Sequence, residues 1–159
     1  MFLKPDYNIG KVYEIPKQEL KAQGIKAILL DLDSTVMVSK SGEYLPETLE
    51  WFDSMQKDFK LAIVSNNKSE NYLEKVKACT PFPVIGDAKK PKTDGINLAL
   101  QQLNVSASET VMVGDRPLTD ILAGKRADMK TILVQSISYE KESKIVHFVR
   151  ALERLSIKR

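Results

Sequence analysis

The chain has 159 residues, of which 43% are hydrophobic and 28% are charged, and its formal net charge is +3. A chain of this length and composition is expected to form one domain with a real core, which excludes wholesale disorder, a collagen-like repeat and a multi-span membrane protein. The small excess of basic charge predicts no nucleic-acid partner, and the single cysteine, Cys79, excludes an internal disulfide.

Residues 1–24 combine two prolines with an amphipathic stretch, and we expect an arm that ends in a short helix over 17–23. Charged residues follow Met1 too closely for a signal peptide, and no apolar run approaches the ~18 residues of a membrane-spanning helix. We therefore expect a cytoplasmic protein, with peripheral contact at the inner or a plastid-type membrane surface as an open alternative.

Along the rest of the chain, apolar runs typical of buried strands alternate with amphipathic stretches typical of helices. The predicted strands cover residues 26–31, 60–65, 82–86, 110–114 and 131–134. The predicted helices cover residues 46–58, 69–78, 93–103, 119–126 and about 140–157. This order predicts an α/β fold, a three-layer doubly wound and mostly parallel sheet with helices on both faces, in a single domain over 1–159.

Polar residues follow the predicted strands at the edge where parallel sheets bind ligands. Asp31 and Asp33 end the first strand, Ser65 ends the second, Asp115 ends a later one, and Lys90 lies in a loop. Carboxylates brought together from separate strands repel each other, and a cation that neutralises them relieves the repulsion. Because all these ligands are oxygens, the pattern indicates Mg²⁺.

With Mg²⁺ at this edge, the same residues have the chemistry of phosphoryl transfer. Asp31 can attack phosphorus and form an aspartyl-phosphate. Asp33 can protonate the leaving alcohol and then accept a proton from the hydrolytic water. Ser65 and Lys90 can hold the phosphoryl oxygens together with backbone amides, and Asp115 would anchor the metal.

Four segments of the sequence resemble the motifs of the haloacid dehalogenase (HAD) superfamily in their order and spacing. They are Asp31-Leu32-Asp33-Ser34-Thr35, Ser65-Asn66-Asn67, Lys90-Pro91 and Gly114-Asp115-Arg116-Pro117-Leu118-Thr119-Asp120. Within the superfamily, the chain is similar to the YqeG family of subfamily IIIA phosphatases, from the arm to about Val134. That family includes relatives of the mitochondrial and plastid phosphatidylglycerophosphate phosphatases, which act in phospholipid biosynthesis.

The resemblance implies a HAD-like, Rossmann-type fold and a role for each motif residue. Asp31 would be the nucleophile and Asp33 the general acid/base. The implied phosphate contacts are Ser65, Asn66 and Lys90, and the implied Mg²⁺ ligands are Asp31, Asp33 through its backbone carbonyl, Asp115, and Asp120 through water. Thr35 would brace the first loop. Ser34 departs from the Asn or Glu that the family usually has, and the Lys-Pro pattern favours Lys90 over Lys89 as the phosphate contact.

The spacing of the motifs leaves no room for a cap domain. Asp31 and Ser65 are 34 positions apart, Ser65 and Lys90 are 25 positions apart, and each interval holds little beyond a helix and a strand. A site without a cap is open, and it suits a large substrate such as a phospholipid head group at a membrane, or a phosphoprotein.

These arguments together predict a Mg²⁺-dependent phosphomonoester hydrolase with an aspartyl-phosphate intermediate. The resemblance alone implies the substrate, phosphatidylglycerophosphate, which would be converted to phosphatidylglycerol. Two alternatives stay open: a HAD phosphatase acting on a soluble sugar or nucleotide phosphate, and a non-hydrolytic, phospho-accepting signalling module. Such a module lacks the general acid/base that Asp33 supplies here. No pattern indicates an oligomeric state.

Two segments have the composition of membrane-surface elements. The arm carries Phe2, Leu3, Tyr7 and Tyr13 with Lys4 and Lys11. The C-terminal helix carries an apolar stripe of Ile145, Phe148, Val149, Leu152 and Leu155, with the basic residues Lys144, Arg150, Arg154, Lys158 and Arg159. Basic amphipathic elements can rest on anionic lipid. For the arm we leave the question open, and for the helix we expect the stripe to pack on the sheet with its charges in water.

Overall fold

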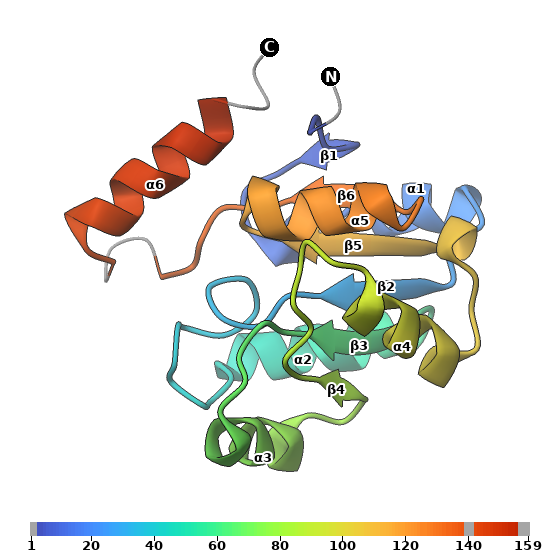
Figure 1. Cartoon of the computed structure of the whole chain (residues 1–159). Helices are drawn as coiled ribbons and strands as arrows, with labels where there is room; N and C mark the ends of the chain where they lie inside the picture. Colours follow the sequence, from blue (N-terminus) through green and yellow to red (C-terminus); the bar gives the residue numbers. More distant parts are fainter. Residues whose placement is uncertain (1–2, 139–141, 156–159) are drawn as a thin grey trace.

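A parallel sheet forms the centre of the computed structural model, which describes residues 3–138 and 142–155 (Figure 1). Within these residues the sheet has six strands in the order β1-β6-β5-β2-β3-β4, and every neighbouring pair is parallel. The strands are β1 Tyr7–Asn8, β2 Ala27–Leu30, β3 Lys60–Val64, β4 Val84–Ile85, β5 Thr110–Gly114 and β6 Lys130–Leu133. The predicted α/β fold with a mostly parallel sheet is confirmed.

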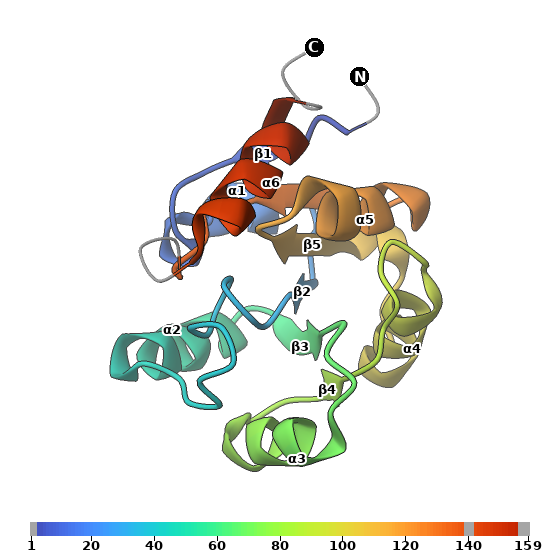
Figure 2. The ribbon, with the colours of Figure 1, turned by 60° about the vertical axis from the view of Figure 1, so that its left-hand side comes forward.

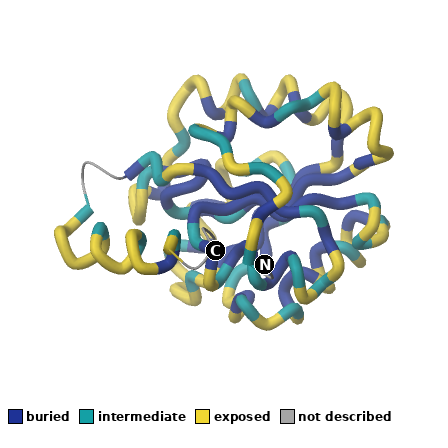
Figure 3. Tube along the Cα trace, turned by 90° about the horizontal axis from the view of Figure 1, so that it is seen from above, coloured by how far each residue is buried: buried dark blue, intermediate teal, exposed yellow. Residues whose placement is uncertain are grey.

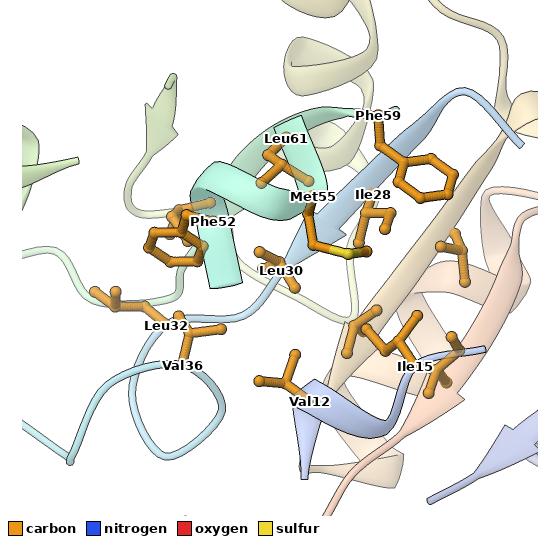
Figure 4. Packing of buried hydrophobic residues seen from close by; sticks show 14 of the residues in the cluster. Val12, Ile15, Ile28, Leu30, Leu32, Val36, Phe52, Met55, Phe59 and Leu61 are labelled. Carbon is orange, nitrogen blue, oxygen red and sulfur yellow. The ribbon is translucent and has the colours of Figure 1, made fainter. Parts of the chain in front are cut away.

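Helices cover both faces of the sheet, as Figure 2 shows from a second direction. On one face, Ile28 and Leu30 of β2 pack in a core with residues of α1, α2 and α3; Figure 4 shows part of this core. On the other face, Ala27 and Leu29 pack with residues of α4 and α5. These helices are α1 Lys17–Ala22, α2 Pro46–Gln56, α3 Glu70–Cys79, α4 Asp94–Leu103 and α5 Leu122–Arg126. Burial on both faces is why β2 is apolar at every position.

The register of the central strands determines which residues share the carboxyl edge of the sheet. Leu30 of β2 lies opposite Ile63 of β3 on one side and Val113 of β5 on the other. The next residue, Asp31, donates its backbone N–H to the Val113 carbonyl at 2.9 Å. The polar residues that follow β2 and β5 therefore emerge at nearly the same level.

Local sequence explains where several helices begin, and the structure differs from the prediction at one helix start and in three short elements. Pro46 opens α2, and the Ser69 side chain caps α3 by accepting the backbone N–H of Tyr72. The predicted helix over 119–126 begins earlier, because Pro117 starts a wide turn, η3 (Pro117–Ile121), that leads into α5. Three short elements were not predicted: β1, η1 (Val12–Glu14) and η2 (Ala107–Glu109).

The C-terminal helix α6, Lys144–Leu155, is present, but the prediction that its apolar stripe packs on the sheet is wrong. Its polar side faces the body of the protein: Arg154 donates to the Val134 carbonyl, and buried Glu153 pairs with Arg116. The apolar stripe is exposed instead, and Figure 3 shows α6 as a largely exposed helix beside the sheet. Some predicted positions lie outside the described residues. They are residues 156–157 at the end of the predicted helix, the basic residues Lys158 and Arg159, and Phe2 of the arm.

No cap domain stands over the carboxyl edge of the sheet. Residues 31–90 consist of connecting loops with α2, β3, α3 and β4, as the motif spacing predicted. Among the described residues, no helix is long and apolar enough to cross a membrane.

Candidate active site

Three aspartates from separate elements meet at the carboxyl edge of the sheet. Asp31 follows β2, Asp115 follows β5, and Asp120 lies in η3. One carboxylate oxygen from each lies within 4.8 Å of the other two. Asp115 and Asp120 are buried, and Asp31 keeps partial access to solvent. We call these three residues the acid cluster.

Lys90 lies inside the acid cluster and Lys89 does not. The Lys90 ammonium donates to Asp31 Oδ1 at 2.8 Å and to Asp120 Oδ1 at 2.6 Å, and its side chain is 1% exposed. Burial alone would lower the pKa of Lys90, but the carboxylates of Asp120 and Asp31 outweigh it and raise the pKa, so the lysine is charged. Lys89, by contrast, is exposed.

Asn66 holds the main chain of Lys90 in place. Its amide Oδ1 accepts the Lys90 backbone N–H at 2.7 Å, and its Nδ2 donates to the Lys90 carbonyl at 2.9 Å. Both ends of the Asn66 amide are therefore used on backbone. Asn66 therefore supports the lysine, and the direct contact to phosphate that the resemblance implies stays a prediction.

Thr35 and Gly114 fix how closely the acids approach. The Thr35 hydroxyl lies 2.9 Å from Asp115 Oδ1 and 3.4 Å from Asp31 Oδ2, so it spans two strand ends. At Gly114, an added Cβ would lie 2.2 Å from a carboxylate oxygen of Asp120. Only glycine leaves room for this carboxylate. Its Oδ2 accepts the backbone N–H of Arg116 at 3.1 Å, and its Oδ1 accepts from Lys90.

The charges of the acid cluster are not fully neutralised by the protein. Burial, together with repulsion from Asp31 and Asp120, raises the pKa of Asp115 to about 8. Asp115 Oδ2 is ion-paired with the Arg150 guanidinium but accepts no hydrogen bond from the described residues. Three carboxylates this close together, paired with the two cations Lys90 and Arg150, fit a hard divalent cation such as Mg²⁺.

The carboxylate of Asp33 is not part of the acid cluster. Its Oδ1 accepts the Tyr72 hydroxyl at 2.6 Å and the Lys40 backbone N–H at 2.9 Å. Burial and the neighbouring Asp33 raise the pKa of Tyr72, which keeps the phenol protonated as a donor. Tyr72 was not predicted from the sequence, since it belongs to no motif and reaches Asp33 from α3.

Ser65 lies buried just after β3, as predicted, and its backbone is held on both sides. Its N–H donates to the Ile85 carbonyl, and its carbonyl accepts the Ala88 N–H. The Ser65 Oγ accepts the Asn67 N–H at 3.1 Å. Within the described residues no hydrogen bond joins Ser65 to the acid cluster.

Arg150 of α6 also reaches this site, which the sequence reasoning missed. Its guanidinium pairs with Asp115 and also donates to both carboxylate oxygens of Glu142, at 2.7 and 2.9 Å. Glu142 in turn accepts the hydroxyls of Ser136 at 2.5 Å and Ser34 at 3.4 Å. Ser34, the position that departs from the family pattern, is thereby connected to α6.

Comparisons with known proteins agree with this geometry. A profile of the haloacid dehalogenase-like hydrolases matches residues 12–134. The probable phosphatase YqeG of Bacillus subtilis is 32% identical over 154 residues, which cover 96% of this chain and 88% of the relative. Phosphatidylglycerophosphate phosphatase 1 of Arabidopsis thaliana is 26% identical over 99% of this chain, which spans about half (48%) of that relative.

A solved structure shares the fold. The crystal structure of a HAD phosphatase from Thermococcus onnurineus superposes with a TM-score of 0.60 at 16% sequence identity. The match covers 70% of this chain and 86% of the other.

Proposed function

The chain belongs to the haloacid dehalogenase-like hydrolases and is a phosphatase of that family, and from this premise we propose that it is a Mg²⁺-dependent phosphomonoesterase with Asp31 as nucleophile. The observation that carries the proposal is the meeting of Asp31, Asp115 and Asp120 around the buried Lys90 ammonium. Of the three acids, Asp31 alone keeps partial access to solvent, and so to a substrate.

In the first half of the reaction, an oxygen of Asp31 attacks phosphorus while the bond from phosphorus to the alcohol oxygen breaks. Asp33 gives its proton to the departing alcohol. Lys90 pairs with the attacking carboxylate and offers its charge to the phosphoryl oxygens, with the Ser65 hydroxyl as a second donor. The products of this half are the free alcohol and an acyl phosphate on Asp31.

In the second half, water attacks the same phosphorus and the bond to Asp31 breaks. Asp33, now ionised, takes the proton from the water, which restores both aspartates and releases inorganic phosphate. Tyr72 donates to the Asp33 carboxylate and so orients it. Thr35 keeps Asp31 and Asp115 in their relative positions.

The proposed Mg²⁺ ligands are Asp31, Asp115 and the backbone carbonyl of Asp33, with Asp120 acting through water. When bound, the ion supplies positive charge to the acid cluster and to the phosphoryl oxygens. The charge balance supports this set, because the three carboxylates of the acid cluster form ion pairs with two cationic side chains among the described residues, Lys90 and Arg150.

For the substrate we propose phosphatidylglycerophosphate, which would yield phosphatidylglycerol. Two observations support this choice over a soluble phosphate ester. The Arabidopsis relative, which is named as a phosphatidylglycerophosphate phosphatase, aligns with 99% of this chain. The carboxyl edge also lacks a cap domain, so a large head group carried by a membrane has access to it.

The test compares phosphate release from phosphatidylglycerophosphate in mixed micelles with release from a panel of sugar and nucleotide phosphates, each with Mg²⁺ and with EDTA. We expect turnover of the lipid with Mg²⁺ only, faster than that of any soluble ester. Equal or faster turnover of a soluble ester would discard the lipid assignment. A chain that becomes phosphorylated on Asp31 but releases no phosphate would instead be a phospho-accepting module.

A further inference from the structure

The outward side of α6 carries a continuous apolar surface. We call the five residues of this surface the outer face. They are Ile145 (76% exposed), Phe148 (64%), Val149 (37%), Leu152 (51%) and Leu155 (56%). Large apolar side chains gathered on one exposed helix side are unusual in a protein that works alone in water, and they mark an interaction site. The stripe follows helical spacing over the whole of α6.

The opposite side of α6 is fixed to the body of the protein by charged contacts. Arg150 pairs with both Asp115 and Glu142. Glu153 pairs with Arg116 at 2.5 Å. Arg154 donates to the Val134 carbonyl at 3.0 Å. Rotating the helix to bury its outer face would break all of these contacts and leave Glu153 and Asp115 buried without their cations. The outer face is therefore held outward.

Charge and size together indicate what covers the outer face. Residues 142–155 contain two acids, Glu142 and Glu153, and both pair with arginines, while Lys144 at the start of α6 is exposed. The sequence beyond the helix adds two more basic residues, Lys158 and Arg159. An exposed apolar stripe flanked by positive charge complements an anionic lipid surface.

A second copy of the chain fits this face less well. A helix of 12 residues is about 18 Å long and about 10 Å wide, so one side offers a few hundred Å² at most. A stable dimer buries about 800 Å² on each partner. Interfacial helices, by contrast, bind bilayers with this much apolar area when positive charge assists them.

We propose that α6 docks the protein on an anionic bilayer through its outer face. Because Arg150 reaches Asp115 from the inner side of the same helix, docking places the acid cluster beside the lipid surface. The docking itself does not depend on hydrolysis; its use, bringing the site to a lipid substrate, rests on the proposed function.

The test is co-sedimentation of the full chain with vesicles of phosphatidylcholine and phosphatidylglycerol in equal parts, and with vesicles of phosphatidylcholine alone. We expect binding to the mixed vesicles that weakens with salt, and at least about tenfold weaker binding for the double variant Phe148→Ser/Leu152→Ser. The matched control is Leu98→Ser, because Leu98 is 44% exposed on α4, and it should bind as the unsubstituted chain does.

Three results would overturn the proposal. The first is no binding to the mixed vesicles. If the chain is then also a dimer, and the double variant is a monomer, a second copy of the chain covers the outer face instead. The second is equal binding to both vesicle types, which removes the role of charge. The third is a large fall in the melting temperature of the double variant, which would mean that the outer face packs inside. Phosphate release from phosphatidylglycerophosphate in the mixed vesicles, with Mg²⁺, is measured in parallel: binding without hydrolysis rejects the proposed function and leaves the docking intact.

Discussion

Replacing Lys90 with methionine removes the one ammonium that lies between Asp31 and Asp120. With an effective dielectric constant of about 20, charges about 3 Å apart attract by about 5–6 kcal/mol per pair before desolvation is counted. Breaking a buried pair by removing one partner costs about 3–5 kcal/mol, because the other charges stay buried. At about 2–4 °C per kcal/mol for a chain of this size, we expect the melting temperature of Lys90→Met in EDTA to fall by about 6–20 °C.

The matched control is Lys89→Met, one position earlier, where the side chain is exposed. A surface change of this kind should alter the free energy of unfolding by less than about 0.5 kcal/mol. Urea denaturation of both variants, with EDTA and with Mg²⁺, gives the comparison. Mg²⁺ should stabilise Lys90→Met more than it stabilises the unsubstituted chain, since the variant has lost a competing cation. Equal losses for the two variants, or a loss below about 1 kcal/mol at Lys90, would refute the electrostatic account of the site.

Four further substitutions test the assigned roles. Asp31→Asn should reduce phosphate release by at least about 10³-fold without lowering the melting temperature, because it removes the nucleophile and one of three repelling carboxylates. Asp33→Asn should abolish turnover while hydroxylamine-sensitive phosphate accumulates on Asp31, and retention of full turnover would show that the acid/base role is wrong. Tyr72→Phe should lower kcat about tenfold with little change in KM, since it removes the hydroxyl that orients Asp33. Asp58→Asn should lower the melting temperature slightly at pH 7, because two lysines of α1 lower the pKa of this carboxyl to about 2. A carboxyl whose pKa is depressed on folding stabilises the fold above its unfolded pKa of 3.8, so this difference should vanish as the pH falls from about 4 to about 2.

The sheet and its order of helices follow from the sequence because both rest on local signals. Runs such as Ala27–Leu30 are apolar at every position, and Pro46 and Ser69 mark helix starts. The two-residue strand β1 gives no such signal. It is held by distant partners, with the Asp6 carboxylate accepting the backbone N–H of Thr131 at 2.8 Å.

The candidate site was only partly predictable for a related reason. Strand ends locate Asp31 and Asp115, but the choice between two adjacent lysines depends on how the loop turns, and the structure shows Lys90 turned inward. Tyr72 and Arg150 reach the site from helices distant in the sequence, so no motif identifies them.

The orientation of α6 shows what an amphipathic pattern leaves out. Periodicity tells which residues share a side of a helix, but not which side meets the rest of the molecule. Here the polar side carries Arg150, which pairs with the buried side chain of Asp115, and Glu153, which pairs with Arg116. The polar side therefore faces inward.

The open carboxyl edge has a consequence for how this phosphatase would select its substrates. An enclosed pocket discriminates by shape, because it surrounds the molecule that enters. In this chain, residues 31–90 form loops, α2, β3, α3 and β4, and no cap domain is inserted among them. The part of a substrate beyond its phosphate would therefore extend outside the site. Selectivity then rests on contacts to the phosphate and its immediate surroundings, and the purified protein should discriminate little among small phosphate esters.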